Sequence, residues 1–192
     1  KGFGVEALPQ GIVAAGAALH YLQETHHDKT AHITQITRIE EDRYVWLDKF
    51  TARNLELVHS PNENAKTLLE VIDQTSTPMG SRLMRRWIML PLKDKAAIEE
   101  RLSVVDYLVR ERDFAYNLRQ HVKSIGDLER LISKVAVGRI NPRELLQLKR
   151  SLQEIADIKG LCAQVKEESF QRLSEQLNAC HSIAQRIERE IK

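Results

Sequence analysis

Four histidines in the first part of the chain are the residues best suited to binding a metal ion. They are His20, His26, His27 and His32, with Asp28 among them. A zinc site on one helix face needs two ligands four residues apart, and no pair of these histidines has that spacing, so only an assumed loop could bring them together. We therefore interpret the segment as a solvated linker and predict no metal ligand there.

Adjacent acidic residues offer a second possible chemistry, that of a general acid paired with a general base. Glu99 and Glu100 are neighbours, as are Glu167 and Glu168. Neighbouring residues on a helix do not share a face, so we interpret both pairs as surface charge. The motifs G-x-x-x-x-G-K-[ST], G-x-S-x-G and H-E-x-x-H do not occur in the sequence. We therefore assign no catalytic and no cofactor-binding residue.

A basic cluster offers a third possibility, contact with nucleic acid. Arg82, Arg85, Arg86, Lys93 and Lys95 could bind DNA phosphates through sequence-independent, salt-sensitive contacts. The alternative is that the cluster forms structural ion pairs, and we favour it. The charged residues available for such pairs include Arg112, Arg119, Glu56, Asp73, Asp127 and Glu129. We keep Arg82, Arg85 and Arg86 as secondary candidates for DNA binding.

The basic cluster lies in and just after a segment with clear helix punctuation, Thr75 to Pro91. Thr77 is a favourable N-cap, Pro78 suits the first helical position, and Pro91 marks a stop. These signals predict a helix from Pro78 to about Leu90.

The predicted helix has one broad apolar face opposite its three arginines. Its apolar residues are Met79, Leu83, Met84, Trp87, Ile88 and Leu90. Gly80 falls within this face, where glycine costs about 1 kcal/mol relative to alanine. We therefore predict that a neighbouring backbone approaches closely at Gly80 and that Trp87 is buried.

The same segment carries a resemblance to a known family. TPMGSRLMRRWIMLPL, with TARNLEL and TLLEVIDQT before it and KDKAAIEERLSVVDYL and IGDLERLISKVA after it, resembles the core of the MutS family of DNA mismatch repair proteins. GFGVE, at Gly2 to Glu6, is similar to the tail of that family's connector domain. The resemblance covers essentially the whole chain. It implies that residues 1–30 end the connector and that residues 31–192 begin the core and lever domain.

The resemblance implies a mechanical function for this segment. A lever of stiff helices would relay between a domain that recognises mispaired or unpaired bases and an ATPase domain, neither of which lies in this sequence. The full-length protein would be an ABC-type ATPase using ATP and Mg, whereas this segment would not be an enzyme. The implied partners are mismatched double-stranded DNA, a second MutS subunit and MutL. The alternative is a free-standing helical module for protein–protein interaction.

Composition agrees with a globular protein but does not identify a function. Apolar residues make up 42% of the 192 residues, charged residues 29%, and the net charge is +2. Cys162 and Cys180 are the only cysteines, which favours free thiols. We find no signal peptide, and the most apolar run, Gly11 to Leu19, is too short to span a bilayer. These features predict a cytoplasmic protein without a membrane segment.

The fold predicted from the sequence is a mainly α multi-helix array with a minor β-hairpin in the N-terminal third. The hairpin is expected to pair Ile36–Glu40 with Arg43–Leu47. The other predicted elements are helices. They run from Pro9 to about Thr25, from Pro61 or Asn64 to Ile72, from the N-cap Asp94 to about Arg112, from Phe114 to about Val137 with a bend at Gly126 and a stop at Gly138, and from Asn141 and Pro142 to Gly160. In the helix after Asp94, the residues expected to face inward are Ile98, Leu102, Val105 and Leu108.

The last helix is predicted from a heptad pattern. Apolar residues recur at alternating spacings of three and four: Phe170, Leu173, Leu177, Cys180, Ala184, Ile187 and Ile191. We expect one continuous helix that carries this seam to the end of the chain, with both chain ends cut from a longer protein. Its partner helix is expected to be missing, so the seam should either promote self-association or leave the last turns of the helix frayed.

Overall fold

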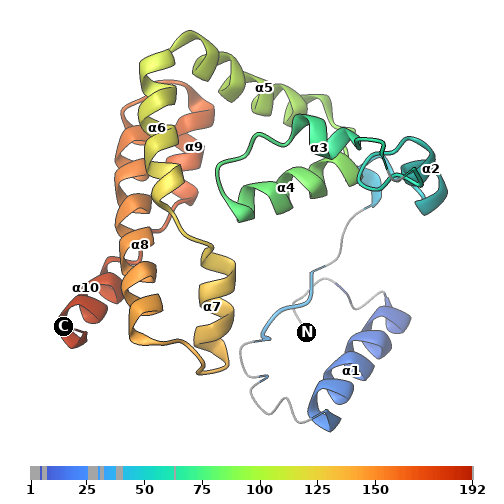
Figure 1. Ribbon diagram of the computed structural model, residues 1–192, viewed down its shortest axis with the longest axis horizontal. Coiled ribbons are helices and arrows are strands. Elements are labelled where there is room, and N and C mark those ends of the chain that lie inside the picture. The colour runs from blue at the N-terminus through green and yellow to red at the C-terminus, as the bar shows by residue number, and fades with distance from the viewer. Residues whose placement is uncertain are drawn as a thin grey trace.

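The computed structural model describes residue 5, residues 8–25, residue 30 and residues 33–37, 41–62 and 64–191. In these ranges the chain is built from helices and their connections, so the mainly α prediction is confirmed. Figure 1 shows a stack formed by the helices from residue 112 onward, next to a layer formed by the helices of residues 49–110. No helix among these residues is both long and apolar enough to cross a membrane.

From residue 78 onward the helices follow each other along the chain with short connections. In chain order the helices are α1 (Pro9–Glu24), a 3-10 helix η1 (Glu41–Arg43), α2 (Lys49–Asn54), α3 (Leu68–Ile72), α4 (Pro78–Met89), α5 (Lys95–Arg110), α6 (Arg112–Ser124), α7 (Leu128–Ala136), α8 (Pro142–Ala163), α9 (Glu168–Gln176) and α10 (His181–Glu190).

Helix α8 is the centre of the stack, with α6, α7, α9 and α10 packed against it (Figure 1). It begins as predicted, because Asn141 and Glu144 form a reciprocal capping box and Pro142 occupies the first turn. Its predicted end at Gly160 is wrong, since the helix continues to Ala163. Nothing lies within 4 Å of where a Cβ of Gly160 would be, so this glycine neither crowds nor ends the helix.

Two hydrophobic clusters lie on α8. The first joins α7, α8 and α10 through Leu131, Leu148, Leu152, Ala184 and Ile187. The second joins α8 and α9 through Ile158, Cys162, Val165 and Phe170, with partly buried side chains from α5 and α6 packed against them. Phe170 is 1% exposed, and the rings of Tyr107 and Phe114 pack against it at centroid distances of 4.8 and 5.5 Å. The core is therefore organised along one central helix.

The predicted single helix from Phe114 to Val137 is two helices. Helix α6 ends at Ser124 and α7 begins at Leu128, with Gly126 between them. The N–H of Gly126 donates to Ser151 Oγ of α8 at 3.1 Å. A Cβ on Gly126 would lie 2.5 Å from Gln147 Nε2, so the connection runs directly against α8. Gly138, with a φ of 65°, follows α7 as expected.

The predicted continuous helix from Phe170 to Ile191 is also wrong. The chain leaves helical geometry after Gln176, and Cys180 adopts the left-handed conformation with φ 46° and ψ 46°. Lys159 of α8 donates to the carbonyl oxygen of Leu177 at 2.8 Å, which satisfies a backbone group at the break. The seam packs on α8 on both sides of the break, so much of the predicted missing partner lies within this chain.

The predicted β-hairpin does not form in the described residues. Arg43 belongs to η1, Ile36 and Thr37 have no regular structure, and residues 38–40 lie outside the described ranges. Tyr44 instead makes an isolated antiparallel bridge with Leu92. Tyr44 and Val45 of this segment thus pair with the chain that follows α4.

The start of the helix before α4 also differs from the prediction. Ser60 does not cap a helix: its hydroxyl donates to Glu56 Oε1 at 2.9 Å and accepts from the N–H of Asn62 at 3.0 Å. The capping box is formed by Thr67 and Glu70, and α3 begins only at Leu68. The starts expected at Pro61 and Asn64 are therefore wrong.

Helix α5 turns to the core a face that shares only Leu108 with the predicted one. Leu108 packs on the second hydrophobic cluster as expected, together with Val104 and Tyr107. Ile98, Leu102 and Val105, which were expected to point inward, are exposed. At the start of the chain, α1 matches the predicted helix but has no buried residue.

Candidate functional site

Helix α4 is held at both ends, close to the predicted positions. Thr77 is the N-cap and its hydroxyl accepts from the N–H of Gly80 at 3.1 Å, while Pro78 occupies the first turn. The helix ends at Met89, one residue before the predicted end. The carbonyl of Pro91 then accepts from the N–H of Val45 at 2.7 Å, which joins the end of α4 to the segment before α2.

Gly80 is crowded, but by different atoms from those predicted. A Cβ here would lie 3.1 Å from Thr75 Cβ and 3.2 Å from Thr77 Oγ1, both side-chain atoms of the preceding turn rather than a neighbouring backbone. Asp73 orders this turn: it accepts from Ser81 Oγ and, at 2.6 Å, from Thr75 Oγ1. These hydrogen bonds, with Ser81 the strongest contributor, lower the pKa of Asp73.

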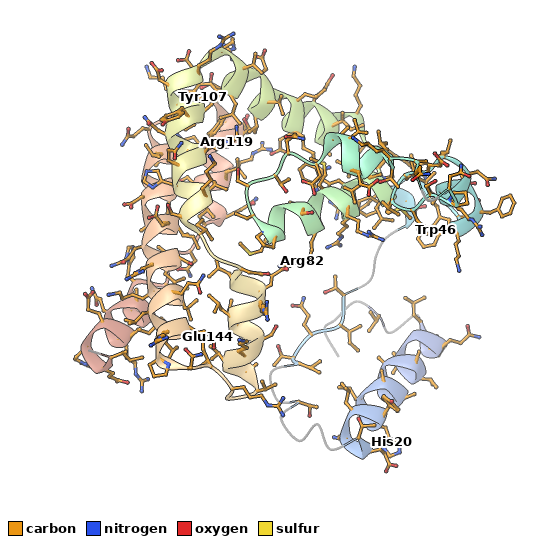
Figure 2. The ribbon with its side chains drawn as sticks, viewed as in Figure 1. His20, Trp46, Arg82, Tyr107, Arg119 and Glu144 are labelled. Carbon is orange, nitrogen blue, oxygen red and sulfur yellow. The ribbon has the colours of Figure 1, made fainter. Side chains whose placement is uncertain are left out.

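Arg82 bridges α4 to α7. Its guanidinium donates to both carboxylate oxygens of Asp127, at 3.1 and 2.6 Å, and its Nε donates to Glu129 Oε2 at 2.6 Å. The hydrogen bond from Arg82 is the main reason why the pKa of Asp127 is lowered, and the same contacts raise the pKa of Arg82. Figure 2 shows Arg82 between the two helices. The structural ion pair expected from the sequence is present at this arginine.

The other two arginines of α4 are exposed. Among the described residues, no ion pair joins Arg85 or Arg86 to an acidic side chain, and the same holds for Arg112 and Arg119. DNA binding by Arg85 and Arg86 therefore stays a prediction, whereas Arg82 already has two carboxylate partners.

Trp87 lies at the edge of a groove, and the prediction that it is buried is wrong. It is 40% exposed, and the guanidinium carbon of Arg101 lies 3.7 Å from its ring centroid. The groove has a volume of about 490 Å³ and is lined from α4, α5 and α9. The apolar face of α4 is thus covered in part by a stacked arginine rather than by a hydrophobic core.

The acidic pairs considered in the sequence lie in ion pairs. Arg172 contacts Glu100 at 3.1 Å and also Glu168, while Glu99 lies 3.5 Å from Lys95. Glu167 lies 3.7 Å from Arg110. These contacts agree with the interpretation as surface charge, and those of Arg172 with Glu100 and of Arg110 with Glu167 also join α5 to the start of α9.

The early histidines do not form a described site. His20 is exposed and lies 3.9 Å from Glu24 on its own helix, and His26, His27 and His32 lie outside the described residues. Sequence reasoning missed a different cluster, formed by His121 with Glu154 and Asp157. Glu154 and Asp157 are three residues apart on α8, but only the packing of α6 on α8 brings His121 to them.

The stack around α8 and the Arg82 bridge from α4 to α7 define a helical scaffold domain. Residues 50–192 match the protein family described as MutS domain III. The DNA mismatch repair protein MutS of Phocaeicola vulgatus is 55% identical over 192 residues, which is the whole of this chain and 22% of the relative. The corresponding protein of Cytophaga hutchinsonii is 52% identical over 187 residues, or 97% of this chain and 22% of the relative.

The chain therefore belongs to the MutS family of DNA mismatch repair proteins. It spans about a fifth of the length of the curated relatives that it matches.

Proposed function

We propose that this chain is the core and lever segment of a mismatch repair protein, and that it relays between mismatch recognition and ATP turnover performed by other domains. The observation that carries the proposal is the Arg82 bridge, which joins α4 to the helical stack through two carboxylates of α7. A relay needs elements that move together, and a bidentate ion pair between two helices supplies such a connection.

The packing of the stack supports the same function. Two hydrophobic clusters hold α8 to its neighbours, and α5 connects the stack to the layer that contains α4 (Figure 1). Packed helices transmit displacement because their interiors resist compression. We place the end of a connector domain at residues 1–30 and the first part of the core and lever domain at residues 31–192, in agreement with the family match over residues 50–192.

For the whole protein we propose the partners and cofactors that its family membership suggests. These are mismatched double-stranded DNA bound through other domains, a second MutS subunit, MutL, and ATP with Mg in an ABC-type ATPase domain. We place the protein in the cytoplasm, where a bacterial repair protein would meet the chromosome.

The test is the effect of Arg82→Ala on the full-length protein that carries this segment. We expect mismatch affinity without ATP to stay unchanged, and the change in affinity on adding ATP to shrink by about 2-fold to 30-fold. Asp127→Asn should act in the same direction. An Arg82→Ala protein that keeps the complete ATP response would overturn the relay.

Arg85→Ala is the matched control, because Arg85 is exposed on the same helix. If the relay depends on the bridge, Arg85→Ala leaves the ATP response intact. If Arg85 or Arg86 contacts DNA, its removal instead weakens binding to DNA of every sequence. The slope of log binding constant against log salt concentration should then fall in magnitude by about one. If the chain were instead a free-standing interaction module, it would not be joined to an ATPase domain. There would then be no ATP response for a variant of α4 to alter.

A further inference from the structure

We infer that His121, Glu154 and Asp157 form a binding site for a divalent transition metal ion, such as Zn²⁺, between α6 and α8. One ligand atom of each residue lies within 4.8 Å of the other two. His121 Nδ1 and Glu154 Oε2 are 2.8 Å apart. The inference concerns this chain alone and does not depend on the proposed relay.

The geometry suits three protein ligands with room for a water. Zinc bonds to nitrogen and oxygen are about 2.0–2.2 Å long, so two ligands of one tetrahedral ion lie about 3.4 Å apart. The His121–Glu154 contact is about 0.6 Å shorter than this, and the ligand atoms of all three residues lie within 4.8 Å of one another. Asp157 is exposed, so its side chain can rotate to bring a carboxylate oxygen to the ion.

The electrostatic setting also favours a cation. Other carboxylates on or facing α8 contact basic side chains, as Glu144 does with Lys134 and Glu188 does with Lys149. Within the described residues, Glu154 contacts an imidazole instead, and no lysine or arginine pairs with Asp157. With neutral histidine, the cluster therefore carries two negative charges that a divalent ion would balance.

The donor types select the class of metal. Imidazole nitrogen favours Zn²⁺ and related transition metals, whereas Mg²⁺ and Ca²⁺ prefer sites made from oxygen ligands alone. An ion here would also join α6 to α8 next to the second hydrophobic cluster, in which Val122 takes part. Metal binding should therefore stabilise the fold as well as fill the site.

The experiment uses the chain after treatment with a chelator, titrated with zinc chloride by calorimetry and followed by thermal unfolding. We expect a saturable site and a zinc-dependent rise in Tm. Asp157→Asn and His121→Ala should weaken the affinity about tenfold or more. Asp157→Asn is the more decisive variant. Without zinc it should have the same Tm as the wild type, and its Tm should not rise when zinc is added.

Two controls separate this site from the other histidines. His181→Ala removes an exposed histidine of α10 and should leave zinc binding unchanged. The double variant His26→Ala, His27→Ala should also bind as the wild type does. Zinc binding that survives in Asp157→Asn and His121→Ala, or that is lost in the double variant, would overturn the inference. Magnesium chloride that raises the Tm as much as zinc chloride would overturn the assigned class of metal.

Discussion

Single polar residues at the helix junctions set the positions of the helices. Ser151 is fully buried in α8, where its hydroxyl accepts from the N–H of Gly126 and donates to the carbonyl of Gln147. Asp127 caps α7 and also receives Arg82, so one carboxylate serves a helix end and an ion pair. Both residues hold the connection from α6 to α7: Asp127 lies in it, and Ser151 contacts it from α8.

Ser151→Ala should destabilise the chain by about 1–3 kcal/mol, because the N–H of Gly126 would lose its partner while staying against α8. Urea unfolding measures the change. Ser133→Ala is the control, since Ser133 makes a similar hydrogen bond to the carbonyl of Glu129 on an exposed face. Equal effects of the two substitutions would contradict a special role for Ser151.

Asp127→Asn should lower stability in a pH-dependent manner while keeping a good N-cap. The pKa of Asp127 is lowered in the folded state, so its contribution is present above the unfolded pKa of about 3.9 and is lost as the pH falls through the folded pKa. The difference in urea midpoint from the wild type should therefore begin to narrow below about pH 4 and should close only below the folded pKa. Asp106→Asn, which removes a pair within α5, should show a smaller difference. A difference independent of pH would count against the Arg82 contact.

At the scale of helices, crowding and burial decide which positions accept substitution. The helical glycines Gly80 and Gly160 have opposite surroundings, and so do the isoleucines Ile183 and Ile187 of α10. Each pair compares the same residue type in two environments.

Gly80→Leu should destabilise by about 1–3 kcal/mol through overpacking against Thr75 and Thr77. Gly160→Ala should instead stabilise α8 by about 0.5–1 kcal/mol, because its Cβ enters open space and alanine is the better helix former. Thermal unfolding of both variants tests the comparison. An unchanged midpoint for Gly80→Leu would refute the crowding.

Ile187→Ala should cost about 2–5 kcal/mol, because Ile187 is 8% exposed within the first hydrophobic cluster. Ile183, on the same helix, is 50% exposed and its replacement by alanine should cost little. The expected readout is loss of stability without a change in oligomeric state. Dissociation of an oligomer by Ile187→Ala, measured by analytical ultracentrifugation, would restore the self-association predicted from the heptad pattern.

At the scale of the whole molecule, the arrangement supports a mechanical role. The stack around α8 and the layer around α4 are joined through α5 and through the Arg82 bridge. A groove lined by Trp87 and Arg101 remains between α4, α5 and α9. The sequence contains no phosphate-binding G-x-x-x-x-G-K-[ST] motif along its length.

The purified chain should therefore show no ATP turnover and no change in Tm with ATP. Turnover assays and thermal unfolding with ATP and Mg are the measurements. A saturable, stoichiometric rise in Tm would show a nucleotide site that the sequence motifs did not reveal.

The sequence by itself determined that most elements are helices and where many of them begin, because helix capping depends on residues close together in the sequence. Thr77, Asp94 and Asn141 each cap a helix at the predicted position, since an N-cap hydrogen bond spans only a few residues. The family could also be recognised from sequence, because the resemblance lies in long contiguous runs.

Only the tertiary structure decided how the helices break and what their faces meet. The heptad pattern identified the apolar side of α9 and α10, but the break at Cys180 depends on contacts with α8, including the hydrogen bond from Lys159 to Leu177. Likewise, the exposure of Trp87, the pairing of Arg82 with Asp127 and the meeting of His121 with Glu154 join residues far apart in the chain. Spacing along a sequence reports neighbours on one helix, whereas these contacts depend on how separate helices pack.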